Sequence, residues 1–268
     1  MDILKRTLAP ITLEAWQEID RQAKLVLMAY LSARKFVDVT GPQGWDYAAV
    51  PLGRLDVPKG QKKEGVQYGI HAVQPLVECR ASFVLDVWEL DNIIRGAKDI
   101  ELKSLEDAAR EIALFEEDAI YNGFEAGRIV GMKEACRHKP IAFTKSPAGF
   151  LEAVSQGVGT LIAASIGGPY ALVVNPDLWQ LIASYAEGFP LQQHVQGILE
   201  GPIVYSHSSQ GGFLVSTRGQ DLELVIGQDF AVGYQSHTST EVTLFVTESF
   251  TFRIIEPAAF VPLAPKAK

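Results

Sequence analysis

A long two-stranded ribbon is the feature of this sequence that most restricts its fold. Extended chain is predicted from Asp46 to Val57 and again from Val66 to about Leu90, with the polar turn of residues 58–65 between the two runs. A ribbon with a charged tip and few local partners is marginally stable alone in water. It therefore needs another surface to lie on, and a second chain can supply that surface.

Two amphipathic helices flank the ribbon in the sequence. The first begins after the N-cap residue Thr12, and its apolar stripe consists of Trp16, Ile19, Ala23, Val26 and Tyr30. The second is predicted to begin at the N-cap residue Ser104 and to end at Gly123, with an apolar stripe of Leu105, Ala108, Ile112, Phe115 and Ala119. This second helix has the pattern of a long core helix.

The rest of the chain is predicted to form an α/β lobe and a long strand. Between Pro147 and Leu199 the pattern gives a helix, the strand Tyr170–Val174, and one or two helices interrupted at Gly188–Pro190. Apolar residues then alternate with polar ones from Val242 to Ile254, a run far longer than the roughly five or six residues of a typical strand. The chain is therefore expected to be of the α+β class.

Composition excludes several function classes. With 268 residues, of which 47% are hydrophobic and 21% charged, the chain can bury a large core. A net charge of -8 argues against a protein that mainly holds nucleic acid, because phosphate neutralisation needs clustered lysine and arginine. We therefore expect a globular protein without a nucleic-acid partner.

The sequence also predicts a cytoplasmic protein without a membrane partner. Acidic residues, the first of them Glu14, precede any apolar segment at the N-terminus, so no secretory signal is expected. No run reaches the roughly 20 apolar residues that a membrane-spanning helix needs. The two cysteines, Cys79 and Cys136, lie in no metal or redox spacing, which fits a reducing compartment.

Catalytic and metal motifs are missing from the sequence. The five histidines are scattered, and none completes a Glu-x-x-His or H-E-x-x-H motif. The acidic residues Glu111, Glu116, Glu117 and Asp118 are interpreted as a solvated or interface face of the second helix, without a functional role. Ser206–Ser208 is interpreted as a polar turn, because a serine beside a histidine does not create triad geometry. We therefore expect neither a catalytic residue nor a metal site, and no enzyme activity.

Eleven short segments, in order from end to end, resemble the encapsulin family, once named for the bacteriocin linocin. Each segment is weakly specific alone, and together they are strongly specific. They are Ile3–Arg6, Ala9–Pro10, Trp16–Asp20, Arg34–Asp38, Gly41–Pro42, Gly44–Ala49, Asp86–Asn92, Gly168–Val173, Gly227–Asp229, Gly233–Tyr234 and Glu248–Phe252.

The resemblance implies an α+β, HK97-type phage major capsid fold with a peripheral domain, an axial domain and an extended loop. The expected divisions are an N-terminal helix and arm over residues 1–45, the extended loop over 46–71, the peripheral domain over 72–134 and 221–268, and the axial domain over 135–220.

The function implied by the resemblance is that of a shell protein. Its copies would form an icosahedral homo-oligomer, which we expect to be of the smallest size, around a cargo enzyme carrying a terminal targeting peptide. The cargo would be a ferritin-like protein serving iron storage, a dye-decolorising peroxidase or a hemerythrin-like protein. A bacteriophage major capsid protein would share the fold, although these commonly carry an N-terminal scaffold segment. An antibacterial peptidase is the third alternative, and it lacks the expected nucleophile or metal motif.

Three sites are implied by the resemblance. The dock for the cargo peptide would consist of Ile19, Ala23, Val26, Arg34, Asp38 and Val232, with ordinary core packing and an Arg34–Asp38 pair as the alternative. A pore loop near a five-fold axis would contain Glu187, Gly188, Phe189, Pro190 and His194, with a simple helix–helix turn as the alternative. No cofactor is required, but a flavin, FMN, could stack on Trp88 with Arg80 on the same strand face, unless Trp88 is simply a packed or exposed side chain.

Overall fold

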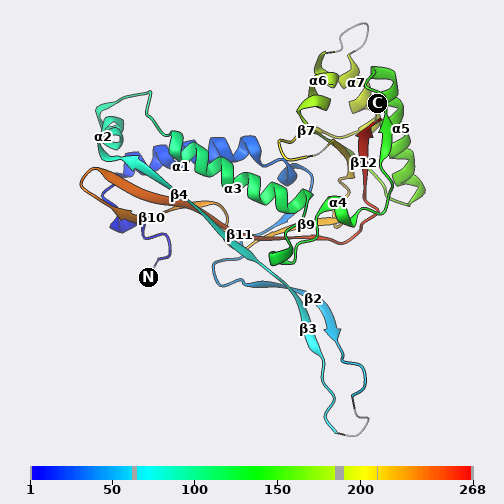
Figure 1. The fold of residues 1–268 in the computed structure, drawn as a ribbon, viewed down its shortest axis with the longest axis horizontal. Coiled ribbons are helices and arrows are strands. Elements are labelled where there is room, and N and C mark those ends of the chain that lie inside the picture. Colours follow the sequence, from blue (N-terminus) through cyan, green and yellow to red (C-terminus); the bar gives the residue numbers. More distant parts are fainter. Residues whose placement is uncertain (1, 62–64, 185–189, 210, 267–268) are drawn as a thin grey trace.

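The computed structural model describes residues 2–61, 65–184, 190–209 and 211–266 (Figure 1). The α-helices are α1 Leu13–Tyr30, α2 Val87–Arg95, α3 Lys103–Tyr121, α4 Met132–Ala135, α5 Pro147–Ala163, α6 Pro176–Ser184 and α7 Leu191–Leu199. Short 3-10 helices are η1 Arg6–Leu8, η2 Ala33–Lys35 and η3 Glu125–Gly127. The strands are β1 Asp38–Thr40, β2 Ala49–Asp56, β3 Ile70–Pro75, β4 Val77–Asp86, β5 Ile141–Phe143, β6 Tyr170–Val174, β7 Ile203–Tyr205, β8 Gly212–Ser216, β9 Leu222–Ile226, β10 Ala231–His237, β11 Glu241–Ile254 and β12 Phe260–Pro265.

One lobe is a five-stranded sheet covered on one face by α1 and α3. Its strand order is β1-β9-β11-β10, and β4 also pairs with β11. Helices α1 and α3 lie side by side along this sheet in Figure 1, and their apolar stripes share one buried cluster with Val232, Leu244 and Val246 from the strands. The predicted cap at Thr12 is confirmed, since its hydroxyl accepts the Ala15 N–H at 3.3 Å.

The long predicted strand is present as the 14-residue β11. Its first part pairs with both β10 and β4, and its last part, from Phe250, pairs with β9, which explains its length, because one strand serves three partners. The polar positions of its alternating pattern are not at the surface. Thr247, Glu248 and Thr251 are all fully buried.

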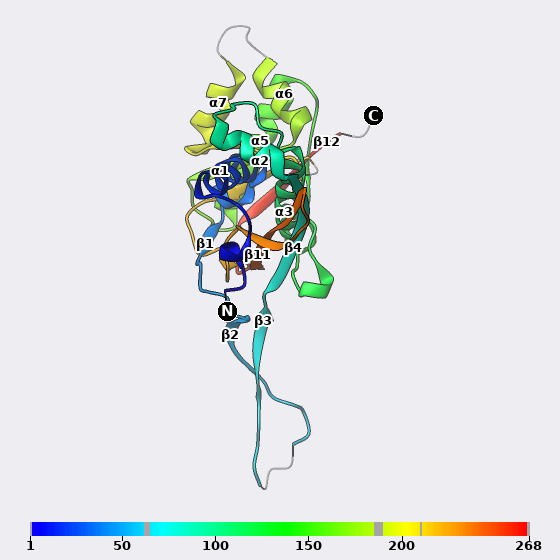
Figure 2. The same cartoon turned by 90° about the vertical axis from the view of Figure 1, so that its left-hand side faces the viewer.

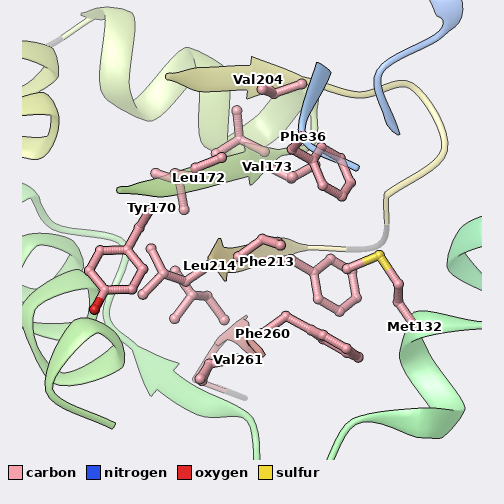
Figure 3. Packing of buried hydrophobic residues seen from close by; sticks show 14 of the residues in the cluster. Phe36, Met132, Tyr170, Leu172, Val173, Val204, Phe213, Leu214, Phe260 and Val261 are labelled. Carbon is pink, nitrogen blue, oxygen red and sulfur yellow. The ribbon is translucent and has the colours of Figure 1, made fainter. Parts of the chain in front are cut away.

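The second lobe is a five-stranded sheet of order β5-β12-β8-β6-β7, packed against α5, α6 and α7. Figure 3 shows its core, where Phe213 and Leu214 of β8 lie between Leu172 and Val173 of β6 and the β12 residue Phe260. The structure differs from the expected divisions at β12. This strand pairs with β8 and β5, so residues 260–265 belong to the sheet of this lobe, although the sequence analysis placed them in the peripheral domain. The strands that pair with β12 are more than forty residues away in the sequence, so the residues around β12 gave no indication of them.

The predicted ribbon is present as the antiparallel pair β2–β3, which extends away from both lobes in Figures 1 and 2. Its second arm is shorter than expected, because the chain continues as β4 and then turns into α2 after Asp86. The Asp86 carboxylate accepts the Trp88 N–H at 2.7 Å and thereby caps α2. Extended chain to Leu90 was therefore a wrong prediction.

The second helix does not begin at the predicted N-cap residue. Helix α3 has Leu102 as its N-cap, and the Ser104 hydroxyl donates to the Val84 carbonyl at 2.6 Å instead of capping the helix. This bond ties the start of α3 to β4. In the part of the chain that the structure describes, no helix is long and apolar enough to cross a membrane.

Candidate functional site

A groove of about 460 Å³ lies between α1 and the first residues of β10. Its apolar walls and floor come from Ala23 and Leu27 of α1 and from Val232 and Val246 of the sheet. Charged residues stand at its ends. The remaining lining residues are Arg6, Asp20, Lys24, Met28, Leu31, Arg34, Asp229, Phe230 and Ala231.

Contacts of the N-terminal segment close one end of the groove. The Arg6 guanidinium lies 4.0 Å from the centre of the Trp16 ring and pairs with Asp20 at 2.7 Å. The Leu4 carbonyl accepts the N–H of Tyr234 at 2.8 Å, so the segment also joins the edge of β10. These contacts tie the N-terminal residues to both walls of the groove.

Arg34 forms the opposite end of the groove and is held by three carboxylates. Its Nε and Nη2 donate to Glu116 of α3 at 3.0 and 2.5 Å, its Nη1 donates to Asp229 at 2.8 Å, and its Nη2 also donates to Glu248 of β11. The side chains of Glu116 and Glu248 are 0% exposed, whereas that of Asp229 is 48% exposed. We call these four residues the Arg34 cluster. It joins the segment after α1 to α3 and to β11.

The electrostatics of the Arg34 cluster favour one protonated carboxyl. Burial raises the pKa of Glu248 well above its ordinary value, and the neighbouring Glu116 carboxylate raises it further, against the opposing effect of Arg34. The Oε2 atom of Glu248 is buried with no hydrogen-bond partner among the described residues. Burial alone would lower the pKa of Arg34, but the bond to Glu116 and the surrounding negative charges raise it, so the guanidinium stays charged.

A second buried carboxyl, Glu117, lies next to the Arg34 cluster on α3. It accepts the Ala33 N–H at 2.8 Å and the hydroxyl hydrogen of Ser32, and the Ser32 hydroxyl lies 2.8 Å from that of Tyr121. Burial raises the pKa of Glu117 to about 7, although the two donors act in the opposite direction. No arginine or lysine ion pair to Glu117 occurs among the residues described.

The interpretation of the α3 acidic residues as a solvated face is therefore wrong for Glu116 and Glu117, which are both 0% exposed. Helical periodicity places both on the edge of the buried face, but charge alone suggested solvent. Their partners, Arg34 and Ser32, lie more than eighty positions earlier, so no local pattern could indicate them. Within the described ranges, no three His, Cys, Asp or Glu side chains converge as a metal site would require.

The residues predicted for the cargo dock lie in three different places. Ala23, Arg34 and Val232 line the groove. Ile19 is fully buried and Val26 half-buried, and both pack within the core beneath α1. Asp38 lies elsewhere, in β1, where its carboxylate accepts the Gln220 N–H.

Arg34 is not available in the predicted way. All three of its guanidinium nitrogens donate to carboxylates of the Arg34 cluster, so the alternative pairing with Asp38 is wrong. The prediction missed the exposed lining residues Lys24 and Met28, which stand one helical turn apart on α1. An exposed methionine beside an apolar stripe was the signal that could have indicated them.

Only part of the predicted pore loop can be placed. Glu187, Gly188 and Phe189 lie outside the described residues. Pro190 precedes α7, and its carbonyl accepts the N–H of His194, an exposed residue of the first helical turn, at 3.3 Å. Helices α6 and α7 lie at the end of the molecule opposite the β2–β3 hairpin (Figure 1).

The arrangement predicted for a flavin is absent. Trp88 and Arg80 were expected on one strand face, but Trp88 belongs to α2, which begins after the cap at Asp86. Arg80 pairs with Glu78 at 2.7 Å and lies 4.8 Å from the centre of the Phe245 ring. Trp88 is 66% exposed. These two residues do not fit FMN in the predicted way.

Comparisons with known proteins agree with one another over nearly the whole chain. A family model described as "Encapsulating protein for peroxidase" matches residues 1–251. A type 1 encapsulin shell protein of Rhodospirillum rubrum is 38% identical, covering 98% of this chain and 96% of the relative, and one of Rhodococcus erythropolis is 37% identical, covering 98% and 100%.

Solved structures show the same fold at lower sequence identity. A virus-like particle protein from Pyrococcus furiosus superposes with a TM-score of 0.69 at 17% identity, covering 94% of this chain and 100% of that one. The capsid protein of the Myoviridae phage XM1 gives a TM-score of 0.56 at 10% identity, covering 85% and 89%. The HK97-type capsid fold predicted from the sequence is confirmed.

Proposed function

This chain belongs to the encapsulin family of shell proteins, and from that premise we propose that its copies close into an icosahedral shell, of the smallest size, around a cargo enzyme. Family membership favours an encapsulin over the two alternatives, a phage capsid protein and an antibacterial peptidase. The relatives are named as shell proteins, which fits a chain whose work is done by interfaces and not by catalysis.

The β2–β3 hairpin is the observation that carries the assembly proposal. It extends beyond both lobes (Figure 2). Its apolar side chains are exposed in the subunit. These residues are Leu52, Leu55, Val57, Val66, Tyr68, Ile70 and Val73. A ribbon that exposes so many apolar side chains gains stability when a neighbouring subunit covers it, and a closed shell covers every copy.

We propose that the groove between α1 and β10 receives the targeting peptide of the cargo. Its apolar walls suit small apolar side chains, and its charged ends suit the polar groups of a peptide. A dye-decolorising peroxidase or a ferritin-like protein is the cargo we propose, and the family description, which refers to a peroxidase, supports the first.

A pore at the tip of the second lobe is a further part of the proposal. The loop predicted from the sequence at residues 187–194 would surround an opening for small substrates, with His194 near it. Shortening the loop by residues 187–189 should then change the rate at which small ions reach an encapsulated cargo, and an unchanged rate would contradict the pore.

The groove is tested by two matched substitutions on α1. Met28 lines the groove and is 61% exposed, whereas Leu25 is 52% exposed on the same helix and does not line it. Met28→Glu should assemble normally and reduce encapsulated cargo at least tenfold, because loss of one buried methionine contact is worth about 1.5–3 kcal/mol. Leu25→Glu should assemble and load like the wild type.

The measurement is negative-stain microscopy of purified particles together with the ratio of cargo to shell protein by quantitative mass spectrometry. Each shell variant is co-expressed with the peroxidase or ferritin-like protein of the same genome. A monodisperse monomer of the wild-type chain would overturn the shell proposal. Equal cargo in the Met28 and Leu25 variants would overturn the groove but not the shell.

A further inference from the structure

One edge of β10 is left without a partner strand beside the groove. In the part of the chain that the structure describes, β10 stands at the end of the sheet path and pairs only with β11. In an antiparallel pair, the N–H and C=O of alternate residues point away from the partner strand. The Tyr234 N–H, which donates to Leu4, shows that Tyr234 is one of these outward residues. Val232, two positions earlier, shares its orientation.

The outward N–H and C=O of Val232 have no hydrogen-bond partner among the described residues. Val232 nevertheless lines the groove and is only 3% exposed. Buried backbone polar groups are nearly always paired, because leaving one unpaired costs free energy. An unpaired donor and acceptor at a groove wall therefore point to a main-chain partner that arrives with the occupant.

The dimensions of the groove suit a short extended peptide. Along α1 it runs from Asp20 to Leu31, a length of about 16 Å at the helical rise of about 1.5 Å per residue. Along the sheet its lining residues are Phe230, whose ring lies near Arg34, followed by Ala231 and Val232. At about 3.3 Å per residue of extended chain, the length along α1 accommodates about five residues.

The edge already accepts main-chain pairing. At one end, the Leu4 carbonyl already accepts the N–H of Tyr234. Beyond it, a register shift between Tyr234 and Ser236 interrupts the regular pairing of β10 with β11. At the other end, the Asp229 carboxylate accepts the Phe230 N–H at 2.9 Å. The available edge is therefore confined to the residues that line the groove.

We propose that the occupant of the groove adds a sixth strand to this sheet: about five residues of a cargo peptide lie extended between α1 and β10 and bond to the N–H and C=O of Val232. This inference rests on the proposed function and specifies how the partner is recognised. Main-chain bonds would supply affinity, while alternate side chains face the apolar wall of Ala23 and Leu27. The preferred peptides would therefore show a period of two, with no proline at positions that donate to Val232.

The first experiment co-expresses the shell protein with a green fluorescent protein that ends in seven randomised residues. Tails that enter purified shells are sequenced and compared with an untailed reporter. Alternating apolar residues in the enriched tails are expected. If no tail loads better than the untailed reporter, the dock itself is absent and the proposed function fails. Loading by tails that share a helical spacing of three and four would overturn only the added strand.

The second experiment uses the most enriched tail as a synthetic peptide with each backbone amide N-methylated in turn. Binding to purified empty wild-type shells is measured by fluorescence anisotropy. Methylation at the amide that donates to Val232 should weaken binding about tenfold, in line with the loss of one hydrogen bond. Methylation at the neighbouring outward amides should change it less than twofold. Equal effects at all positions would overturn the proposal.

A pair of shell variants tests the protein side. Val232→Ala shortens the side chain and keeps the N–H, whereas Val232→Pro removes the N–H at an edge position where proline is tolerated. Loading of the enriched tail should fall about tenfold further in the proline variant than in the alanine variant. Equal loading would contradict the added strand. If the proline variant does not assemble, the N-methyl series on wild-type shells decides the question.

Discussion

Replacing Arg34 with methionine should destabilise the subunit by about 3–5 kcal/mol. The substitution keeps most of the side-chain volume but leaves Glu116 and Glu248 buried without their cation. The cluster favours one protonated carboxyl even with Arg34 present, so one buried carboxylate is left without its cation. At pH 7 a buried carboxylate can lose its charge by taking up a proton, which costs about 4 kcal/mol for a group with an ordinary pKa near 4.3, so the loss of stability stays in the same range.

The penalty should depend on pH in a defined direction. Burial raises the pKa of Glu248, and the variant would remove the opposing effect of Arg34, so the folded state would bind a proton that the unfolded chain releases. Stability would then fall as pH rises from about 4.3 towards the raised pKa of Glu248. The difference from the wild type should be small at pH 5 and largest at pH 8.

Melting of purified shells by differential scanning fluorimetry at pH 5, 6, 7 and 8 measures this effect. A loss of about 4 kcal/mol lowers the melting temperature by roughly 10 °C for a chain of this size. The triple variant Arg34→Met, Glu116→Gln, Glu248→Gln removes the uncompensated charges and should recover most of the loss. A single variant that melts within about 2 °C of the wild type at pH 8, or a triple variant that melts no higher than the single one, would refute this reasoning.

Three other predictions follow from buried and exposed positions. The wild-type protein should lose about 3 kcal/mol of stability between pH 4.5 and 7, because the raised pKa of Glu117, about 7, makes the folded state bind a proton that the unfolded chain releases. Glu117→Gln should abolish this decline, and urea unfolding of both proteins at the two pH values measures it. Leu55→Asp with Ile70→Asp should leave far-ultraviolet circular dichroism unchanged and abolish particles in size-exclusion chromatography, because both side chains are exposed in the subunit; normal shells would contradict this. Gly233→Ala should cost about 1–3 kcal/mol, since the added Cβ would lie 2.3 Å from the Phe245 ring; an unchanged melting temperature would show that the ring moves freely.

Local patterns in the sequence were sufficient for most of the elements. The spacing of Trp16, Ile19 and Ala23 specifies α1, and the alternation from Val242 to Ile254 specifies β11. Both signals come from residues within one element, because helix and strand place side chains at fixed periods. The hairpin was predictable for the same reason, since two extended runs enclose one polar turn.

Some assignments failed because a tertiary contact outweighed the local pattern. Ser104 was expected to cap α3, but the Val84 carbonyl on β4 accepts its hydroxyl hydrogen instead. Likewise, β12 joins β8 and β5 across a long stretch of chain. Strand partners at such separations depend on the whole fold and not on the composition of either strand.

The sequence by itself determined the family, the elements and the apolar face of α1, because each is written in short-range spacing or in motifs that keep their order along the chain. Only the tertiary structure decided the chemistry of the groove. It brought Arg34 to Glu116, Asp229 and Glu248, from three distant parts of the chain, and so converted an expected peptide anchor into a buried ion cluster. Among the described residues, it also left the main chain of Val232 at the edge of β10 without a partner beside α1. Both outcomes depend on how separate elements pack against one another. Burial of a charged side chain, or loss of a strand partner, that results from such packing leaves no pattern in the neighbouring sequence.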